Sequence, residues 1–283
     1  EHVLLPEAHV GPALLPRMTA PAADWVTICR AAVNDVRVVL DELPTRVERE
    51  PVSKQGVGGD ETTAIDQAAE DAILARFEGL DVTVVSEEIG RYGNGATLVV
   101  VDPIDGSLNA KRGIPYFALS IAFADGETMG DVFLGYVYDF GTGEEWIGRR
   151  GEGATLNGAT LGAVKPKDEI EILSFEATLT SLVAAHAQAV DGLAHRLRVM
   201  GSLALSLCHL AAGRVDAVCS LKPARSVDIA AAQLLCREVG LSLALFDDPR
   251  DFAQAELDLT GRSRIAAAGT ADRCRELASA LSS

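Results

Sequence analysis

The sequence predicts an α/β protein made of two packed halves, each with its own strands and helices. In the first half, short apolar runs rich in β-branched residues follow two segments whose apolar residues recur at helical spacing. From about residue 166 onward, short apolar strands alternate with helices, the pattern of an α/β fold. A chain of 283 residues with 48% hydrophobic residues can bury a large core. We therefore expect a first half over residues 19–165 and a second half over residues 166–283.

The first half is expected to begin with an amphipathic helix over residues 22–43, which Pro44 ends. The polar, glycine-rich stretch over residues 51–60 is typical of a mobile loop. Apolar residues at helical spacing predict a second helix over residues 63–77. Strands are expected at residues 82–85, 98–101, 117–123, 132–138 and 145–148.

The second half is expected to contain four strands, at residues 170–175, 215–219, 241–246 and 264–268. The helices between and after them are expected at residues 202–212, 228–239 and 271–281. Asp228 is a suitable N-cap for the second of these helices, and Gly240 is suited to the position just past its end.

Composition restricts the classes of function. Residues 1–18 are expected to be a disordered N-terminal extension that, being acidic and interrupted by Pro6 and Pro12, does not resemble a signal peptide. No apolar run approaches the roughly 20 residues that span a bilayer, so we expect no membrane partner. A net charge of −16 argues against a nucleic-acid partner. The five cysteines show no paired spacing, which indicates neither zinc nor a disulfide framework and favours the cytoplasm.

The most informative segment is residues 99–107, with the sequence VVVDPIDGS, in which an apolar strand leads to two aspartates, a turn and a hydroxyl. Pro103 keeps the preceding Asp102 extended, so the strand is expected to end on this carboxylate. Gly106 permits close approach of the backbone, and Ser107 is suited to cap the segment that follows. Free amides at such a start attract a phosphate. An oxygen-only ligand set suits Mg²⁺ or Mn²⁺ rather than zinc.

Acidic residues also lie next to other expected strand or helix ends: Asp60, Asp66, Glu87, Glu88 and Asp228. Each has a purely structural interpretation, since Thr63 and Asp66 form a capping-box pattern and a pair of glutamates is typical of a solvated strand end. Capping and catalysis are compatible, because the start of a helix can present its carboxylate to a site. Two carboxylates about 4 Å apart repel by about 4 kcal/mol at an effective dielectric near 20. If these groups converge, divalent cations would relieve that repulsion.

Taken together, these motifs resemble the inositol monophosphatase family in order and spacing. The segments that carry the resemblance are residues 60–66 (DETTAID), 86–90 (SEEIG), 102–109 (DPIDGSLN) and 227–231 (VDIAA), with further similarity at 151–158, 201–208 and 212–217. The resemblance covers roughly residues 22–275, and residues 109–117 look most like the archaeal branch that hydrolyses both inositol phosphates and fructose 1,6-bisphosphate. It implies a layered αβαβα sandwich, as in sugar phosphatases, with the site between the halves. It also implies a homodimer.

The resemblance further implies a role for each matching residue. The ligands of Mg²⁺ would be the carboxylates of Glu87, Asp102, Asp105 and Asp228 and the carbonyl of Ile104. Asp66 with Ser107 would orient or activate the attacking water, and Glu87 would be catalytic as well as a ligand. The amides of Gly106 and Ser107 would bind the phosphate.

Other residues are implied less directly. Glu88 and Asp60 would support the ligands from behind or hold a third ion, and Lys54 lies in what resembles the mobile catalytic loop of the family. A second phosphate on the substrate would need a cation, and the candidates for it are Arg225, Lys222, Lys111 and Arg112. Exposure to solvent explains these four cations equally well.

These observations favour a Mg²⁺-dependent phosphomonoesterase, with Mn²⁺ as a possible substitute, acting on inositol monophosphate, fructose 1,6-bisphosphate or both. In a two-metal site, water attacks the phosphorus directly. An alternative with the same metal site is a phosphatase of 3′(2′),5′-bisphosphate nucleotides or of NADP. An alternative of another class is a non-catalytic relative that binds metal or phosphate. A missing ligand would favour that alternative, and every position is filled. The expected partner is a small phosphorylated polyol or sugar.

Overall fold

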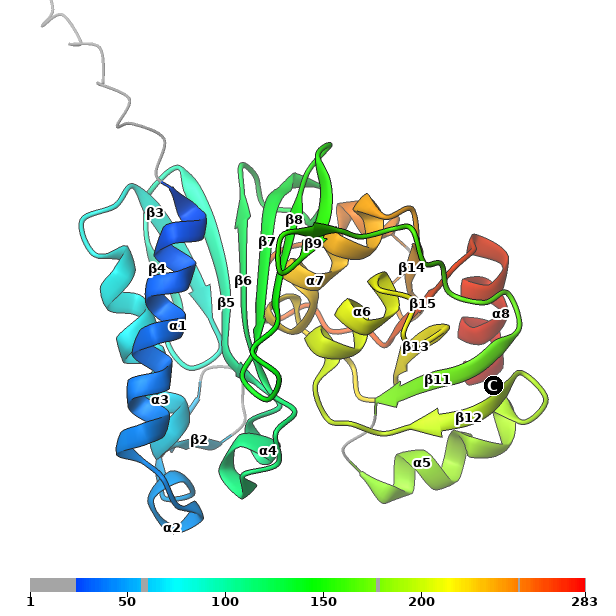
Figure 1. Ribbon diagram of the computed structural model, residues 1–283, viewed down its shortest axis with the longest axis horizontal. Helices are drawn as coiled ribbons and strands as arrows, with labels where there is room; N and C mark the ends of the chain where they lie inside the picture. The colour runs from blue at the N-terminus through cyan, green and yellow to red at the C-terminus, as the bar shows by residue number, and fades with distance from the viewer. Residues whose placement is uncertain (1–23, 57–60, 177–178, 249, 283) are drawn as a thin grey trace, which may run out of the picture.

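The structure is a computed structural model that describes residues 24–56, 61–176, 179–248 and 250–282. The expected extension at residues 1–18 and the candidate Asp60 lie outside these ranges. The described chain forms five layers, helix, sheet, helix, sheet and helix, which are seen edge-on from left to right in Figure 1. The predicted αβαβα architecture is therefore confirmed. No helix in the described ranges is long and apolar enough to cross a membrane.

The first sheet has eight strands in the order β10-β9-β8-β7-β6-β5-β3-β4, and only β3 and β5 pair in parallel. The strands are β3 (Val82–Ser86), β4 (Gly90–Gly93), β5 (Thr97–Asp105), β6 (Ala118–Ala124), β7 (Val132–Asp139), β8 (Glu145–Arg149), β9 (Gly153–Leu156) and β10 (Ala159–Thr160). Its outer face is covered by α1 (Trp25–Glu42) and α3 (Ala64–Leu74).

The second sheet has five strands in the order β12-β11-β13-β15-β14. They are β11 (Ile170–Glu176), β12 (Ala194–Arg198), β13 (Ala217–Ser220), β14 (Ser242–Leu245) and β15 (Ile265–Ala268). The two sheets enclose α6 (Leu203–Ala211) and α7 (Ser226–Glu238), while α5 (Thr180–His186) and α8 (Ala271–Leu281) form the last layer.

Smaller elements complete the described chain. They are α2 (Arg46–Arg49), β1 (Val52–Gln55), β2 (Glu61–Thr63), α4 (Ser107–Arg112) and the 3₁₀ turns η1 (Ala75–Phe77), η2 (Met129–Asp131), η3 (Ala187–Val190) and η4 (Phe252–Gln254). β1 and β2 pair with each other as an antiparallel ribbon. The expected loop at residues 51–60 is thus wrong for residues 52–55, because a polar strand that pairs only with β2 carries no apolar alternation. Residues 57–60 lie outside the described chain.

The central core holds the two halves together. It lies around α6 and α7 and contains fully buried side chains from both expected halves, such as Trp146 and Leu235. At Gly135 in β7, an added Cβ would lie 2.3 Å from the carbonyl oxygen of Ala231 in α7, so only glycine allows this contact between strand and helix. The five cysteines are all buried and free.

Three local expectations near the acidic motifs need correction. β5 does not end at Asp102 but continues past Pro103 to Asp105, with an irregular register in its pairing with β6 that accommodates the proline. Ser107 is the first residue of α4 rather than its cap, since Gly106 occupies the N-cap position with φ +88°. Asp228 is the third residue of α7, and the N-cap of this helix is Arg225. The predicted end of α7 is confirmed, because Gly240 follows the C-cap with φ +81°.

Candidate metal and phosphate site

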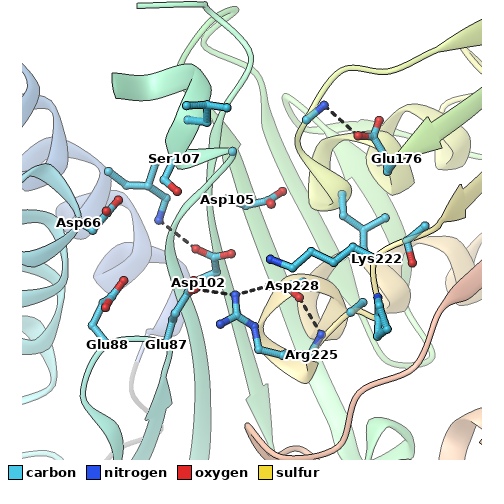
Figure 2. A pocket seen from close by; sticks show the side chains of 18 of the residues that line it. Asp66, Glu87, Glu88, Asp102, Asp105, Ser107, Glu176, Lys222, Arg225 and Asp228 are labelled. Carbon is cyan, nitrogen blue, oxygen red and sulfur yellow. Dashed lines mark hydrogen bonds and ion pairs between the residues drawn. The ribbon is translucent and has the colours of Figure 1, made fainter. Parts of the chain in front are cut away.

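A cavity of about 270 Å³ lies where the two halves meet. The first half contributes the C-terminal ends of β3 and β5 and the starts of α3 and α4. The second half contributes the ends of β11 and β13 and the start of α7. Figure 2 shows the acidic residues of this cavity facing one another across it. The structure brings all of the expected metal, water and phosphate residues in the described ranges to this lining, namely Asp66, Glu87, Glu88, Asp102, Ile104, Asp105, Gly106, Ser107, Lys222, Arg225 and Asp228.

Three of the carboxylates form a tight cluster. Oxygen atoms of Glu87, Asp102 and Asp228 all lie within 4.8 Å of one another, although these residues come from three separate segments of the chain. The Asp102 side chain is held by the backbone N–H of Ile104, which donates to Oδ1 at 3.1 Å. Three buried or half-buried oxygen donors this close together match the preference of Mg²⁺ and Mn²⁺. These residues therefore fit a divalent cation.

Burial gives these carboxylates unusual acidities. Burial raises the pKa of Glu87 to about 7, with Asp228 adding repulsion and Arg225 acting in the opposite direction. Burial, followed by repulsion from Glu87 and Asp105, raises the pKa of Asp102 well above its usual range. Such groups hold a proton near neutral pH unless a cation stabilises their charge. The cluster is therefore built to bind positive charge.

Asp105 lies in the same cavity but has different partners. Its Oδ2 accepts hydrogen bonds from the Ser202 hydroxyl and, at 2.7 Å, from the backbone N–H of Ala204 at the start of α6. Burial raises the pKa of Asp105 to about 7, although these two donors act against the shift. Within the described residues, Asp105 is not part of the three-carboxylate cluster. It joins the end of β5 to the start of α6.

Asp66 is fixed by the capping box that the sequence predicts. Its Oδ2 accepts hydrogen bonds from the backbone N–H of Thr63 at 3.1 Å and from the Thr63 hydroxyl at 2.5 Å. The same oxygen lies 3.2 Å from Nζ of Lys111, one of the cations considered for the substrate. Asp66 therefore caps the start of α3 and also lines the cavity.

The turn at Gly106 is closely enclosed. An added Cβ at this position would lie 3.0 Å from the carbonyl oxygens of both Gly201 and Tyr116, in addition to the strain of φ +88°. The side-chain amide of Asn109 donates to the carbonyl oxygens of Tyr116 at 2.8 Å and Met200 at 2.7 Å. These contacts hold the turn, with the following Ser107, against the second half.

Two cationic side chains of the second half, Lys222 and Arg225, line the cavity. Nη2 of Arg225 lies 2.6 Å from Oε1 of Glu87 and 3.3 Å from Oδ1 of Asp228. Figure 2 shows the Lys222 side chain pointing toward Asp102 and Asp105. By contrast, Arg112 pairs with Glu50 on the surface, and it does not line the cavity. Lys54 lies exposed in β1, and its charge opposes the rise in the pKa of Glu88.

Two buried glutamates, Glu70 and Glu176, support the site, and neither was expected from the sequence. Oε1 of Glu70, in α3, accepts hydrogen bonds from the Ser86 hydroxyl and from the backbone N–H groups of Glu88 and Ile89. Glu70 therefore shapes the turn that carries Glu87 and Glu88. Glu88 also accepts a hydrogen bond from the hydroxyl of Thr62.

The second buried glutamate, Glu176, acts on the opposite wall. It accepts hydrogen bonds from the hydroxyls of Ser174 and Ser206 and, at 2.8 Å, from the backbone N–H of Gly201. Both missed glutamates act through backbone groups distant in the sequence. Neither Glu70, within the expected helix over residues 63–77, nor Glu176, directly after the expected strand over residues 170–175, differs in the sequence from an ordinary surface acid.

Comparison with known proteins gives consistent results. A model of the inositol monophosphatase family matches residues 24–280. The chain is 32% identical over 248 residues to a fructose-1,6-bisphosphatase/inositol-1-monophosphatase of Archaeoglobus fulgidus, covering 87% of this chain and 93% of that protein. It is 31% identical over 250 residues to a protein of Salmonella typhimurium named Nus factor SuhB, covering 85% and 91%. A crystal structure of an inositol monophosphatase–fructose 1,6-bisphosphatase superimposes with a TM-score of 0.81 at 28% identity, covering 91% of this chain and all of that one.

Proposed function

The chain belongs to the inositol monophosphatase family and is a phosphoric monoester hydrolase, and we propose that it hydrolyses inositol monophosphate, fructose 1,6-bisphosphate or both with Mg²⁺. The observation that carries the proposal is the cluster of Glu87, Asp102 and Asp228 inside a cavity that also contains the Gly106 turn. The net reaction adds one water to the phosphate ester, breaks the P–O bond and releases an alcohol and inorganic phosphate.

We assign the divalent cations to the carboxylates of Glu87, Asp102, Asp105 and Asp228 and to the carbonyl of Ile104, with Mn²⁺ as a substitute for Mg²⁺. Ions in such a site make water a better nucleophile and stabilise the charge on the leaving oxygen. Glu88, which also lines the cavity, supports these ligands or holds a third ion. The raised pKa values of Glu87, Asp102 and Asp105 support this assignment, because these carboxylates gain most from a bound cation.

The remaining residues orient the reactants. In this proposal, Asp66 accepts a hydrogen bond from the attacking water, and the Ser107 hydroxyl helps to orient that water. The contacts of Asp66 with Thr63 and Lys111 support this role, because they fix its carboxylate. The amides of Gly106 and Ser107 bind the phosphate in the enclosed turn. The proton that the water loses passes through the site to the oxygen of the broken P–O bond, which leaves as the alcohol.

The choice of substrate rests on the cations of the second half. Lys222 and Arg225 line the cavity and offer positive charge to a phosphorylated sugar or polyol, including one with a second phosphate. The archaeal relatives that are named for both activities support the same choice. A nucleotide bisphosphate shares this chemistry and is therefore tested in parallel.

The test is phosphate release from inositol 1-phosphate, fructose 1,6-bisphosphate and 3′-phosphoadenosine 5′-phosphate while Mg²⁺ is titrated. We expect Mg²⁺-dependent release from one or both of the first two compounds. Release from the nucleotide alone would replace the proposal by the nucleotide phosphatase. No release from any compound, with metal binding intact, would favour a non-catalytic relative.

We also propose that the protein is a cytoplasmic homodimer. The homodimer follows from the family resemblance, and the five buried free cysteines are consistent with a reducing compartment. Light scattering coupled to size-exclusion chromatography should give twice the chain mass of 29.8 kDa. A monomer at micromolar concentration would contradict the homodimer and would leave the catalytic proposal standing.

A further inference from the structure

Arg225 is the most unusual cation in the described chain, because it is buried among the residues assigned to metal. Its side chain is 7% exposed, and Nη2 lies 2.6 Å from Glu87 and 3.3 Å from Asp228. The backbone N–H of the same residue donates to the other oxygen of Asp228 at 2.7 Å. One residue therefore engages two of the three clustered carboxylates.

The position of Arg225 in the fold makes this contact persistent. Arg225 is the N-cap residue of α7, and Asp228 lies one turn further along the same helix. The guanidinium crosses from there to Glu87, which follows β3 in the first half. A guanidinium does not lose its proton in proteins, so this cation cannot be removed by a change of pH.

We propose that Arg225 is an internal counter-cation that competes with the divalent metal for Glu87 and Asp228. This inference rests on the proposed metal site. It concerns the affinity of that site for metal, which the identity of the ligands does not determine alone. The guanidinium holds these two half-buried carboxylates in place before metal binds. The metal must then replace an existing ion pair, and its apparent affinity is weakened by the free energy of that pair.

The charges in the cluster support competition between Arg225 and the metal ion rather than binding of both to the same carboxylates. Glu87, Asp102 and Asp228 carry at most three negative charges, and Arg225 neutralises one of them. The charges of Glu87, Asp228 and Asp102 raise the pKa of Arg225 despite its burial, which means that the three carboxylates together stabilise the guanidinium. A metal ion at the same oxygens would repel the guanidinium and draw on the same negative charge. Arg225 would then turn toward an anionic substrate in the cavity.

The test is the dissociation constant of Mn²⁺ and Mg²⁺, measured by calorimetry without substrate on EDTA-treated, dialysed protein. The variant Arg225→Met should bind metal more tightly than the wild type by about tenfold, a usual size for the coupling between two ligands. Without metal, the same variant should unfold at a lower temperature, because the carboxylates then lack a counter-cation. Metal should therefore raise its unfolding temperature more than that of the wild type.

The matched control is Arg237→Met, which removes an arginine from the same helix. Arg237 is exposed and bonds to the carbonyl of Met129, outside the cavity. This variant has the same change in net charge and should keep the wild-type metal affinity. If Arg225→Met does not fold, Arg225→Lys replaces it. We expect this variant to bind metal about threefold more tightly than the wild type, because an ammonium group cannot bridge two carboxylates as the planar guanidinium does.

The outcomes separate the two proposals. Equal or weaker metal binding by the Arg225 variant, with the control unchanged, would overturn competition and make Arg225 a structural support of the ligands. Absence of metal binding in the wild-type protein would overturn the proposed function itself. Tighter binding in the Arg225 variant alone is the result that competition predicts.

Discussion

The substitution Asp102→Asn changes charge in the carboxylate cluster with little change of shape. Asp102 is buried, and asparagine can still accept the hydrogen bond from the backbone N–H of Ile104. At 4.8 Å, two unit charges repel by about 3 kcal/mol at an effective dielectric of 20. The variant loses the repulsions from Glu87, Asp105 and Asp228 and the weaker attraction to Arg225.

Because repulsion exceeds attraction, the variant gains free energy of unfolding without metal, by about 3 kcal/mol for each repulsion that no attraction offsets. The measured gain is smaller, because the raised pKa of Asp102 shows that protonation already relieves part of the repulsion. In EDTA, the variant should therefore unfold at the wild-type temperature or above it. Stability and activity should then change in opposite directions.

We expect kcat to fall strongly in this variant, because a proposed ligand of the catalytic ions is lost. A metal ion contributes several kcal/mol to stabilising the transition state, and a loss of about 4 kcal/mol lowers kcat roughly 10³-fold. The assay is phosphate release at saturating Mg²⁺. Asp125→Asn serves as the control, since Asp125 pairs with Arg150 on the surface, and it should keep wild-type kcat. A kcat for Asp102→Asn within tenfold of the wild type would refute the assignment of this ligand.

Three further predictions follow from other features. Gly106→Ala should lower kcat at least tenfold and the free energy of unfolding by about 2 kcal/mol, measured by phosphate release and urea unfolding, because alanine at φ +88° also meets the carbonyl of Gly201; a neutral effect would mean that the turn is not closely packed. Glu70→Ala should weaken Mn²⁺ binding at least tenfold in calorimetry, because the turn carrying Glu87 loses three hydrogen bonds. Unchanged binding would show that this turn keeps its conformation without Glu70. Burial, together with the charge of Arg214, lowers the pKa of His209 in the folded protein below 6.5. The stability that neutral His209 contributes is therefore fully present above pH 6.5, and it is lost as the pH falls from 6.5 through the pKa of the folded state, because the unfolded chain binds the proton more readily. His209→Gln should reduce this acid-side loss in thermal unfolding, and an unaltered pH profile would contradict it.

The candidate site was more predictable than the contacts that shape it. Glu87 follows β3, Asp102 lies in the last part of β5 and Asp228 lies in the first turn of α7, and local signals were enough to predict that these three residues share one cavity. The partners of Glu70 and Glu176 are backbone groups far away in the sequence, so no local pattern indicates them. These contacts depend on how the layers pack.

The fold shows the same distinction. Buried strands such as β5 and β6 carry continuous apolar runs, and their positions were predicted to within a few residues. β12, with the sequence AHRLR, lies at an exposed sheet edge and has no apolar run that would mark it as a strand. The N-cap of α7 was predicted three residues too late, at Asp228 instead of Arg225, because Asp228 suits both the N-cap and the third position of a helix.

The most direct test of the metal site is anomalous diffraction from crystals soaked in Mn²⁺ at a concentration that saturates catalysis. Our account predicts an anomalous peak bounded by oxygens of Glu87, Asp102 and Asp228, with the Arg225 guanidinium moved away from it. A fully active enzyme whose anomalous peaks all lie elsewhere would contradict the account.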